Sequence, residues 1–416
     1  MKAKRLDRDF PPSDDPPAAK RRKDVDSDLH NPHDTAVAAA DGVESTAIRL
    51  LRLLLQCAEY VATENLQEAS SLLLEISEIS SPFASSPERV VAYFAQALQA
   101  RVFSSCLGAY TPLTAQRSLT MAQSQKIFAA LQSYNSVSPL IKFSHFTANQ
   151  VIFEAVEGED RVHIIDLDVM QGLQWPALFH ILASRPRKLR SVRITGFGSS
   201  SVLLASTGRR LADFAASLDL PFEFNPVEGK LGDLTELSLS QLGVRSDESV
   251  VVHWMQHRLY DVTGSDAGAL EALRRIRPRL VTVVEQDLSR GGERSFLGRF
   301  VEALHHYSAL FDALGEGMEE ENAERYTVEE QLFGREIKNV VVGRGERKVE
   351  RWWEELSRVG FRPVSLRGNP AAQAGLLLGM MPWKGYSLVE DNGTLRLGWK
   401  DLSLLTASAW LSPPSP

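Results

Sequence analysis

The chain has 416 residues, of which 44% are hydrophobic and 24% charged, and its formal net charge is −7. At roughly 100–200 residues per domain, this length predicts two or three domains, or one large domain with an appended lobe. The acidic balance excludes a protein that coats nucleic acid or an anionic membrane through bulk positive charge, and the two cysteines are too few for a disulfide framework or a cysteine-based zinc site.

Residues 1–45 differ in composition from the rest of the chain. They are rich in charged residues and proline and nearly lack large apolar residues, so burial cannot offset the entropy lost on ordering, and we expect a disordered tail. The tail lacks the apolar segment of a secretory signal, and no run in the chain approaches the roughly 18 apolar residues of a membrane span. Its basic run Lys20-Arg21-Arg22-Lys23 predicts a nuclear-import signal, with a chance cluster of solvated charges as the alternative.

The segment 46–157 is expected to be a mainly helical cap lobe, because its apolar residues recur with helical spacing. The first helix contains two overlapping L-x-x-L-L patterns, which together place Leu50, Leu51, Leu54 and Leu55 in one turn and a half. Its apolar residues cover more than one face, so the helix is expected either to be fully buried or to offer these leucines to a partner chain. Further helices are expected near 66–76, 86–102, 117–133 and 139–156.

Between residues 158 and 411 strands are expected to alternate with helices. Short apolar runs, typical of strands buried on both faces, recur at 162–166, 191–195, 221–225, 250–254 and 280–285. Helical stretches lie near 174–184, 202–218, 233–242, 266–276, 293–314, 346–359 and 371–380, and residues 316–330 favour helix. This alternation predicts a parallel sheet with helices on both faces.

The end of the chain carries a hairpin signal, with strands at 386–390 and 395–399 around Asp391-Asn392-Gly393 and a last apolar run at 402–410. The predicted class is therefore α/β: an N-terminal helical cap lobe on a Rossmann-like, methyltransferase-type, mostly parallel sheet with a C-terminal antiparallel hairpin. Such a likeness of fold implies no activity.

Cofactors of such sheets bind outside the carboxyl ends of the strands, and they need glycines in the loop after the first strand. Here the loop 166–172 has one late glycine and holds bulky Leu167, Val169 and Met170. The second strand ends in Thr195-Gly196-Phe197, without the acidic residue that would bind a ribose. We therefore expect no cofactor and no enzyme activity.

Polar side chains near the end of the first strand admit two interpretations. Asp166 and Asp168 are either an acid–base pair or caps of the following turn and helix, and the second is favoured because no nucleophile or phosphate loop accompanies them. Gln171, Gln174 and Trp175 either line a crevice for a small polar ligand or, the favoured interpretation, pack the strand–helix junction. A small-molecule pocket that also includes His163 stays an alternative, and the spacing of His253 and His257 is a weak metal signal because it falls at a strand end.

Five ordered motifs resemble those of the plant GRAS-domain family of transcriptional regulators, in its SCARECROW and SCARECROW-like subgroup. Residues 162–166 read VHIID, the family motif letter for letter, and leucine-rich regions lie near 48–130 and 202–240 on either side of it. Arg335 and Glu336 fit the PFYRE region, and Ser408 and Trp410 belong to the terminal SAW motif. The resemblance covers about 46–411, and the short N-terminal region favours a SCARECROW-like member.

The resemblance implies a nuclear co-regulator of plant development that acts in complexes, with no metal and no membrane partner. It implies pairing with the GRAS protein SHORT-ROOT through the leucine-rich helices, with a homodimer as the alternative, and action beside indeterminate-domain C2H2 zinc-finger proteins that contact DNA. Direct DNA binding is the competing hypothesis; its best candidate is the basic stretch 185–190, which otherwise is a solvated loop.

Overall fold

The computed structural model describes residues 32–107, 120–235, 239–240, 242–288, 295–316, 322–343, 349, 351–382 and 384–414. The chain divides into two compact units, residues 1–46 and 47–416. Helix α1 (Pro32–Ala62) begins inside the segment predicted to be disordered, which corrects the prediction for its last residues. The predicted import signal at Lys20–Lys23 lies outside the described residues.

A nine-stranded sheet forms the centre of the second unit, with strand order β3-β2-β1-β4-β5-β9-β8-β7 and β6 paired with β9. The first five strands pair in parallel and the last four are antiparallel, as the predicted class requires. The strands are β1 (Arg161–Asp166), β2 (Ser191–Gly198), β3 (Phe222–Glu228), β4 (Ser249–Met255), β5 (Leu280–Gln286), β6 (Arg362–Val364), β7 (Tyr386–Asp391), β8 (Thr394–Trp399) and β9 (Leu402–Leu411).

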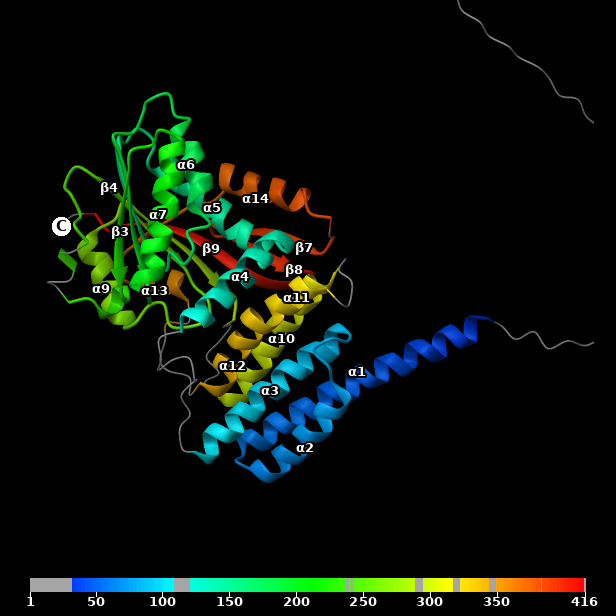
Figure 1. The fold of residues 1–416 in the computed structure, drawn as a ribbon. Coiled ribbons are helices and arrows are strands. Elements are labelled where there is room, and N and C mark those ends of the chain that lie inside the picture. Colours follow the sequence, from blue (N-terminus) through cyan, green and yellow to red (C-terminus); the bar gives the residue numbers. More distant parts are fainter. Residues whose placement is uncertain are drawn as a thin grey trace, which may run out of the picture. The chain divides into compact units, whose positions relative to one another are not determined.

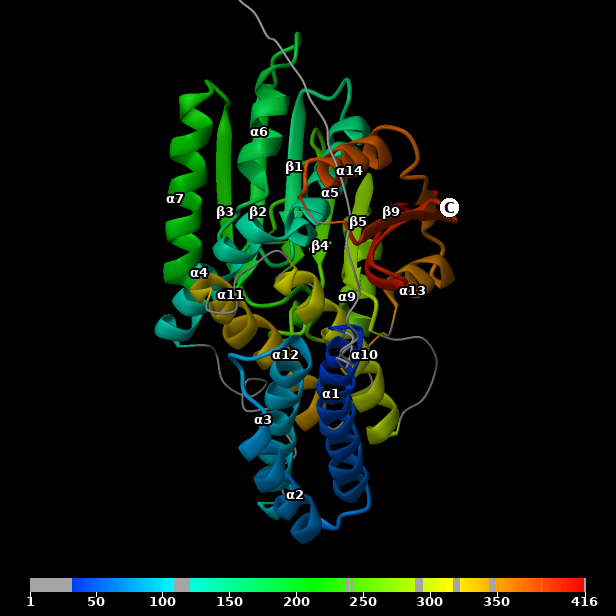
Figure 2. The ribbon, with the colours of Figure 1, turned by 90° about the vertical axis from the view of Figure 1, so that its right-hand side faces the viewer.

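Both faces of the sheet are covered (Figure 1). Helices α5 (Pro139–Ala155), α6 (Trp175–Ala183), α7 (Ser201–Ser217) and α14 (Asn369–Gly379) lie on one face, where Figure 2 shows α6 and α7 in front of the parallel strands. Helices α9 (Asp266–Ile276) and α13 (Trp352–Arg358) pack on the other face. Alternation along β1 sends Val162 and Ile164 to the first core and Ile165 to the second.

The helices that form the cap are not the ones predicted from the sequence. Helix α3 (Ser86–Cys106) packs against α2 (Leu66–Ile79), but also against α10 (Phe296–Gly315) and α12 (Gly334–Val342) from the second half of the chain. Helix α5, predicted to be in the cap, instead contacts β4, β5 and β9, while α4 (Met121–Val137) contacts α11 (Ala323–Val328) and the π-helical turn η2 (Glu329–Phe333). Helical spacing identifies an apolar face but not the element that covers it, which is why the boundary at 157 does not separate cap from sheet.

Local signals explain most element boundaries. Helix α3 opens with a capping box between Ser85 and Glu88 and has proline in its first turn, which satisfies N–H groups that the helix itself leaves unpaired. The hairpin turns at Asn392 (φ 49°) and Gly393 (φ 84°), both in the left-handed region that this turn requires.

Two places in the chain depart from the predicted elements. The range 233–242, expected to be a helix, starts at the last residue of a 3-10 turn, η1 (Leu231–Asp233); residues 239–240 are helical, and 236–238 and 241 lie outside the described residues. Strand β6 escaped prediction because it has three residues and contains Pro363, which fits only an edge position. In the described part of the chain, no helix combines the length and apolarity needed to cross a bilayer.

Candidate functional site

The loop that follows β1, residues 166–172, folds back over the strand ends. The backbone N–H of Leu167 donates to the carbonyl of His253 (3.1 Å), and that of Val169 to the carbonyl of Phe197 (3.0 Å). The N–H of Gly172 donates to Val169 (2.6 Å), and that of Asp168 to the carboxylate of Asp166 (3.1 Å). These four donors are therefore already used within the chain, whereas a phosphate-binding loop aims its N–H groups at the ligand.

Side chains also occupy the space above the end of β2. A Cβ atom at Gly196 would lie 2.8 Å from Val169 Cγ1 and 2.9 Å from Phe224 Cζ, so glycine is needed there to admit these two side chains. Val169 thus fills the position at which the backbone of a cofactor-binding protein would approach its ligand. This packing supports the prediction that the loop is not a cofactor cradle.

The two aspartates of the loop have separate partners. Asp166 accepts from Trp175 Nε1 (2.9 Å), and burial raises its pKa to about 7. Asp168 Oδ2 accepts from His257 Nε2 (2.9 Å) and from the Tyr260 hydroxyl (2.8 Å). His257 Nδ1 accepts from the N–H of Leu259 (3.2 Å), so the proton of the neutral ring is on Nε2. This arrangement favours the capping interpretation, because Asp166 closes the turn and Asp168 ties the loop to the segment after β4.

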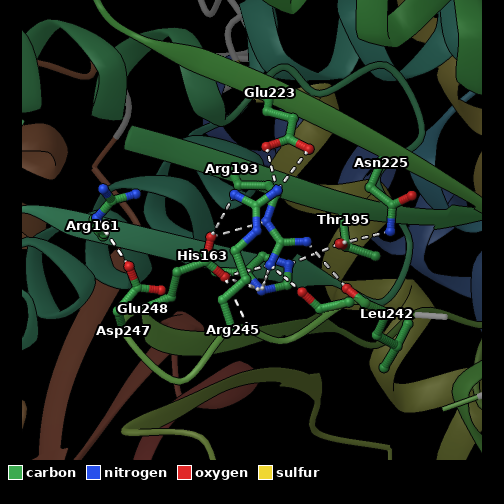
Figure 3. Close-up of polar contacts among 11 residues, drawn as sticks. Arg161, His163, Arg193, Thr195, Glu223, Asn225, Leu242, Arg245, Asp247 and Glu248 are labelled. Atoms are coloured by element: carbon green, nitrogen blue, oxygen red, sulfur yellow. Dashed lines mark hydrogen bonds and ion pairs between the residues drawn. The ribbon is translucent and has the colours of Figure 1, made fainter. Parts of the chain in front are cut away.

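His163 lies on the opposite face of the sheet from Asp166, because side chains alternate along β1, so the pocket predicted to contain both is corrected. Figure 3 shows His163 in a polar network with Arg193, Thr195 and Glu248. Arg193 donates to Glu248, to the carbonyls of Leu242 (3.2 Å) and Gly243 (2.7 Å), and to His163 Nδ1 (3.1 Å). His163 Nε2 then donates to Thr195 Oγ1 (2.8 Å).

Charge and burial set the protonation states of this network. Burial, together with the charge of Arg193, lowers the pKa of His163 to about 3, so the ring is neutral. Burial opposes ionisation of Glu248, but the hydrogen bonds and charge of Arg193 outweigh it and lower the pKa of the carboxyl. Asn225 adds a donor to Thr195 (3.2 Å), so the motif residue His163 is held in a paired network that packs the sheet.

A cavity of about 120 Å³ lies on the other face, beside the loop after β1. It is lined by Asp166, Asp168, Gln171, Gln174 and Trp175 of the predicted site and, across from them, by α4, α5, α10 and η2. Gln171 accepts from Gln132 Nε2 (3.1 Å), and Trp175 is fully buried with its ring edge against His253. The strand-end crevice, an alternative in the sequence analysis, therefore exists around all of the residues considered for it except His163.

The leucines of α1 divide into two pairs. Leu50 and Leu54 are fully buried in the cap, so neither presents its side chain to a partner, which corrects that part of the prediction. Leu51 and Leu55 are half-buried, and Ile48, at helical spacing with them, is 59% exposed. These three residues, hereafter the α1 edge, form the apolar surface that the helix offers.

The remaining motif residues make contacts within the fold. Arg335 donates to Gln331 (3.0 Å) within η2 and α12, and Glu336 accepts from Arg258 N, Gln286 Nε2 and the Tyr307 hydroxyl. Ser408 and Trp410 lie buried in β9, where the indole donates to the Ser408 hydroxyl (3.0 Å). The PFYRE and SAW residues thus join the cap and the last strands to the parallel sheet.

The buried polar groups that sequence reasoning missed include Arg193 with Glu248, and His306 with the Oε1 atom of Gln286. Arg193 could have been found, because an arginine inside a strand that is apolar on both faces must have a buried partner.

The basic stretch 185–190, the candidate for direct DNA binding, makes contacts within the chain. Arg185 donates to the carbonyls of Phe153 and Val156 (3.1 Å each), and Arg190 pairs with Asp160 (3.0 Å).

Residues 50–411 match the model of the GRAS domain family. The chain belongs to this family. It is 71% identical to Scarecrow-like protein 23 of Arabidopsis thaliana over the whole length of both chains. It is 58% identical to Protein SCARECROW of the same plant over 88% of this chain but 56% of that protein. The crystal structure of SCL7 in Oryza sativa, at 35% identity, superposes with a TM-score of 0.71 and covers 87% of this chain and 99% of its own.

The family assignment and the SCARECROW-like subgroup are thereby confirmed. SCARECROW-like proteins of this family are plant developmental regulators, and neither the family match nor these names indicate an enzyme. The fold class is confirmed as well, since the solved GRAS structure and this chain share a mixed α/β architecture around a mostly parallel sheet.

Proposed function

We propose that this protein is a nuclear transcriptional co-regulator of plant radial patterning that works through protein complexes. In this proposal it pairs with a SHORT-ROOT-like GRAS protein and acts beside indeterminate-domain C2H2 zinc-finger proteins that contact the DNA. The observation that carries the proposal is the full-length likeness to Scarecrow-like protein 23. The closed loop after β1 supports it, because backbone N–H groups that could hold a cofactor phosphate are used within the chain.

The α1 edge is the proposed contact for the GRAS partner. Ile48, Leu51 and Leu55 follow the i, i+3, i+7 spacing of a helix that lays one apolar side against another chain. Leu51 and Leu55 pack partly on the cap core, which holds the edge in a fixed position. A carboxylate introduced at Ile48 would stay in solvent in the free protein and would be desolvated in the complex.

The test is calorimetric titration of a SHORT-ROOT-type protein into the full-length chain and two variants. We expect Ile48→Glu to weaken the complex at least about tenfold, which is 1.4 kcal/mol. The matched control is Leu376→Glu on α14, which is 70% exposed and should leave the affinity unchanged. A wild-type chain that does not associate would refute the proposed pairing, while equal affinities of all three proteins would refute only the contact at α1.

Nuclear import is proposed to depend on the basic run Lys20–Lys23. A fluorescent fusion with these four residues changed to alanine should lose its nuclear accumulation in plant cells, while alanines at Lys2, Lys4, Arg5 and Arg8, the other basic cluster of the tail, should leave it intact. A nuclear signal that survives the first set of changes would show that import uses another route.

A further inference from the structure

The cavity beside the loop after β1 contains an imidazole without a hydrogen-bond partner. His306, on α10, is 2% exposed, and neither of its ring nitrogens has a partner among the described residues. An unpaired polar group in a dry interior costs free energy, so such a group in a native protein calls for an explanation. His163, its counterpart across the sheet, has both ring nitrogens bonded.

A second polar atom in the same cavity is also unpaired. Gln286, at the end of β5, uses its amide nitrogen on both oxygens of Glu336 (3.2 and 3.0 Å). This bond fixes the orientation of the amide, and the buried Oε1 atom is left as an acceptor without a donor. The cavity therefore offers one group that can both donate and accept, and a second that only accepts.

The rest of the lining defines the size and polarity of what fits. Leu310, Leu332, Phe333 and Leu405 supply apolar walls. The volume of about 120 Å³ is slightly below that of an apolar cavity of about 150 Å³ known to hold benzene. A nucleoside has about three times as many non-hydrogen atoms as benzene, so the cavity would enclose only part of it. A charged ligand is disfavoured, because the carboxylates of Asp168 and Glu336 already have their donors within the chain.

We propose that this cavity is a binding site for a neutral, mainly apolar molecule of about six to eight non-hydrogen atoms that carries one hydroxyl group, with His306 as the residue that recognises the hydroxyl. Burial, together with the nearby charge of Arg258, lowers the pKa of His306 to about 3. The ring is therefore neutral, with one nitrogen as donor and the other as acceptor, which matches a hydroxyl group. This inference is independent of the proposed function, because it rests only on the cavity and its unpaired groups.

Phenol and benzene are the probes for calorimetric or thermal-shift titration of the full-length protein, because they differ by one hydroxyl. We expect phenol to bind about fivefold more tightly than benzene, the effect of one neutral hydrogen bond. The variant His306→Leu should lose this preference and bind phenol no more tightly than benzene, because the hydroxyl would be desolvated without this partner. The control is His305→Leu, since His305 is adjacent on α10 but exposed, and this variant should keep the preference for phenol.

Absence of phenol binding to the wild-type protein up to the solubility of the probe would overturn the proposal and leave ordered water as the occupant. Equal affinity of wild type for phenol and benzene, or a preference that survives in His306→Leu, would overturn the role of His306. If His306→Leu fails to fold, His306→Phe, which fills the same space with a ring that cannot hydrogen-bond, takes its place and should bind phenol no more tightly than benzene.

Discussion

Two buried histidines on opposite faces of one sheet show what separates a packed polar network from a binding site. His163 is surrounded by Arg193, Glu248 and Thr195, and both of its nitrogens are bonded. His306 lies in a cavity, and neither nitrogen has a partner among the described residues. Burial alone does not distinguish the two, since both rings are at most 2% exposed, whereas hydrogen bonding does.

The largest expected effect on stability comes from disrupting the hydrogen-bonded network around His163. Arg193→Ala would remove the buried cation of Glu248, which would keep only its ion pair with the exposed Arg245 (3.3 Å) among the described residues, and would remove donors from His163 and two carbonyls. Loss of one partner of a buried ion pair costs about 3–5 kcal/mol, so we expect chemical denaturation to show a loss of that size. Arg190→Ala is the control, since its pair with Asp160 is exposed and should contribute under about 1 kcal/mol. A loss below about 1 kcal/mol for Arg193→Ala would contradict the structural role of the network.

The next largest effect concerns the hydrogen bonds of Asp168, in the loop after β1. Tyr260→Phe removes the hydroxyl that donates to Asp168 (2.8 Å) and leaves the ring in place. A hydrogen bond to a charged group contributes roughly 1.5–3 kcal/mol, so unfolding should become easier by about 2 kcal/mol. Tyr60→Phe on α1 is the control, because the Tyr60 hydroxyl only accepts from Gln56 (3.3 Å) at an exposed position. Equal stability of the two variants would show that Asp168 is satisfied without Tyr260.

Acid should destabilise the fold through His163. The ring stays neutral in the folded protein down to about pH 3, but the unfolded chain binds a proton near pH 6.5. The unfolded state therefore holds more protons below pH 6.5, and stability falls as the pH falls. Between pH 7.5 and 5.5 this one group lowers the free energy of unfolding by about 1.4 kcal/mol. The amide of His163→Gln can replace both hydrogen bonds but does not titrate. Over the same pH range the free energy of unfolding of this variant should therefore fall by about 1.4 kcal/mol less than that of the wild type. Identical losses in the two proteins would mean that His163 is protonated in the folded state.

The smallest effect has the opposite sign. His306→Leu replaces an unpaired polar ring by an apolar side chain in a mainly apolar cavity, and we expect a gain of about 1 kcal/mol in unfolding free energy. His305→Leu, at an exposed position, should change stability by less than about 0.5 kcal/mol. A loss of stability in His306→Leu would indicate that the imidazole has a partner and would remove the difference between the two histidines.

Most of the architecture could be predicted from the sequence, because the signals that specify it are local. Apolar runs at 162–166 and 250–254 are strands within a residue or two, and Asn392-Gly393 turns the hairpin as expected. Contacts between distant segments could not be predicted. Nothing in the spacing of 139–156 shows that α5 leaves the cap for the sheet, or that α10 and α12 replace it.

The candidate site, like the fold, could be predicted only where local signals specify it. The closed loop followed from the bulk of Val169 and Met170, and the structure adds its cause, the packing of Val169 over Gly196. The side of the sheet on which His163 lies follows from alternation once the register of β1 is known, so this error was avoidable. The cavity at His306 was not predictable, because it is formed by α4, α5, α10 and η2 together with residues of β1, β4, β5 and β9.

Nitrogen-15 spectra of the histidine side chains test the difference between the two rings most directly. The protein would be labelled at histidine, the signals of His163 and His306 assigned from His163→Gln and His306→Leu, and phenol added. We predict that the ring nitrogens of His306 shift on addition of phenol, while those of His163, already bonded to Arg193 and Thr195, stay where they are. His306 signals that do not move at saturating phenol, or that already have the positions of a fully hydrogen-bonded ring without it, would contradict the account.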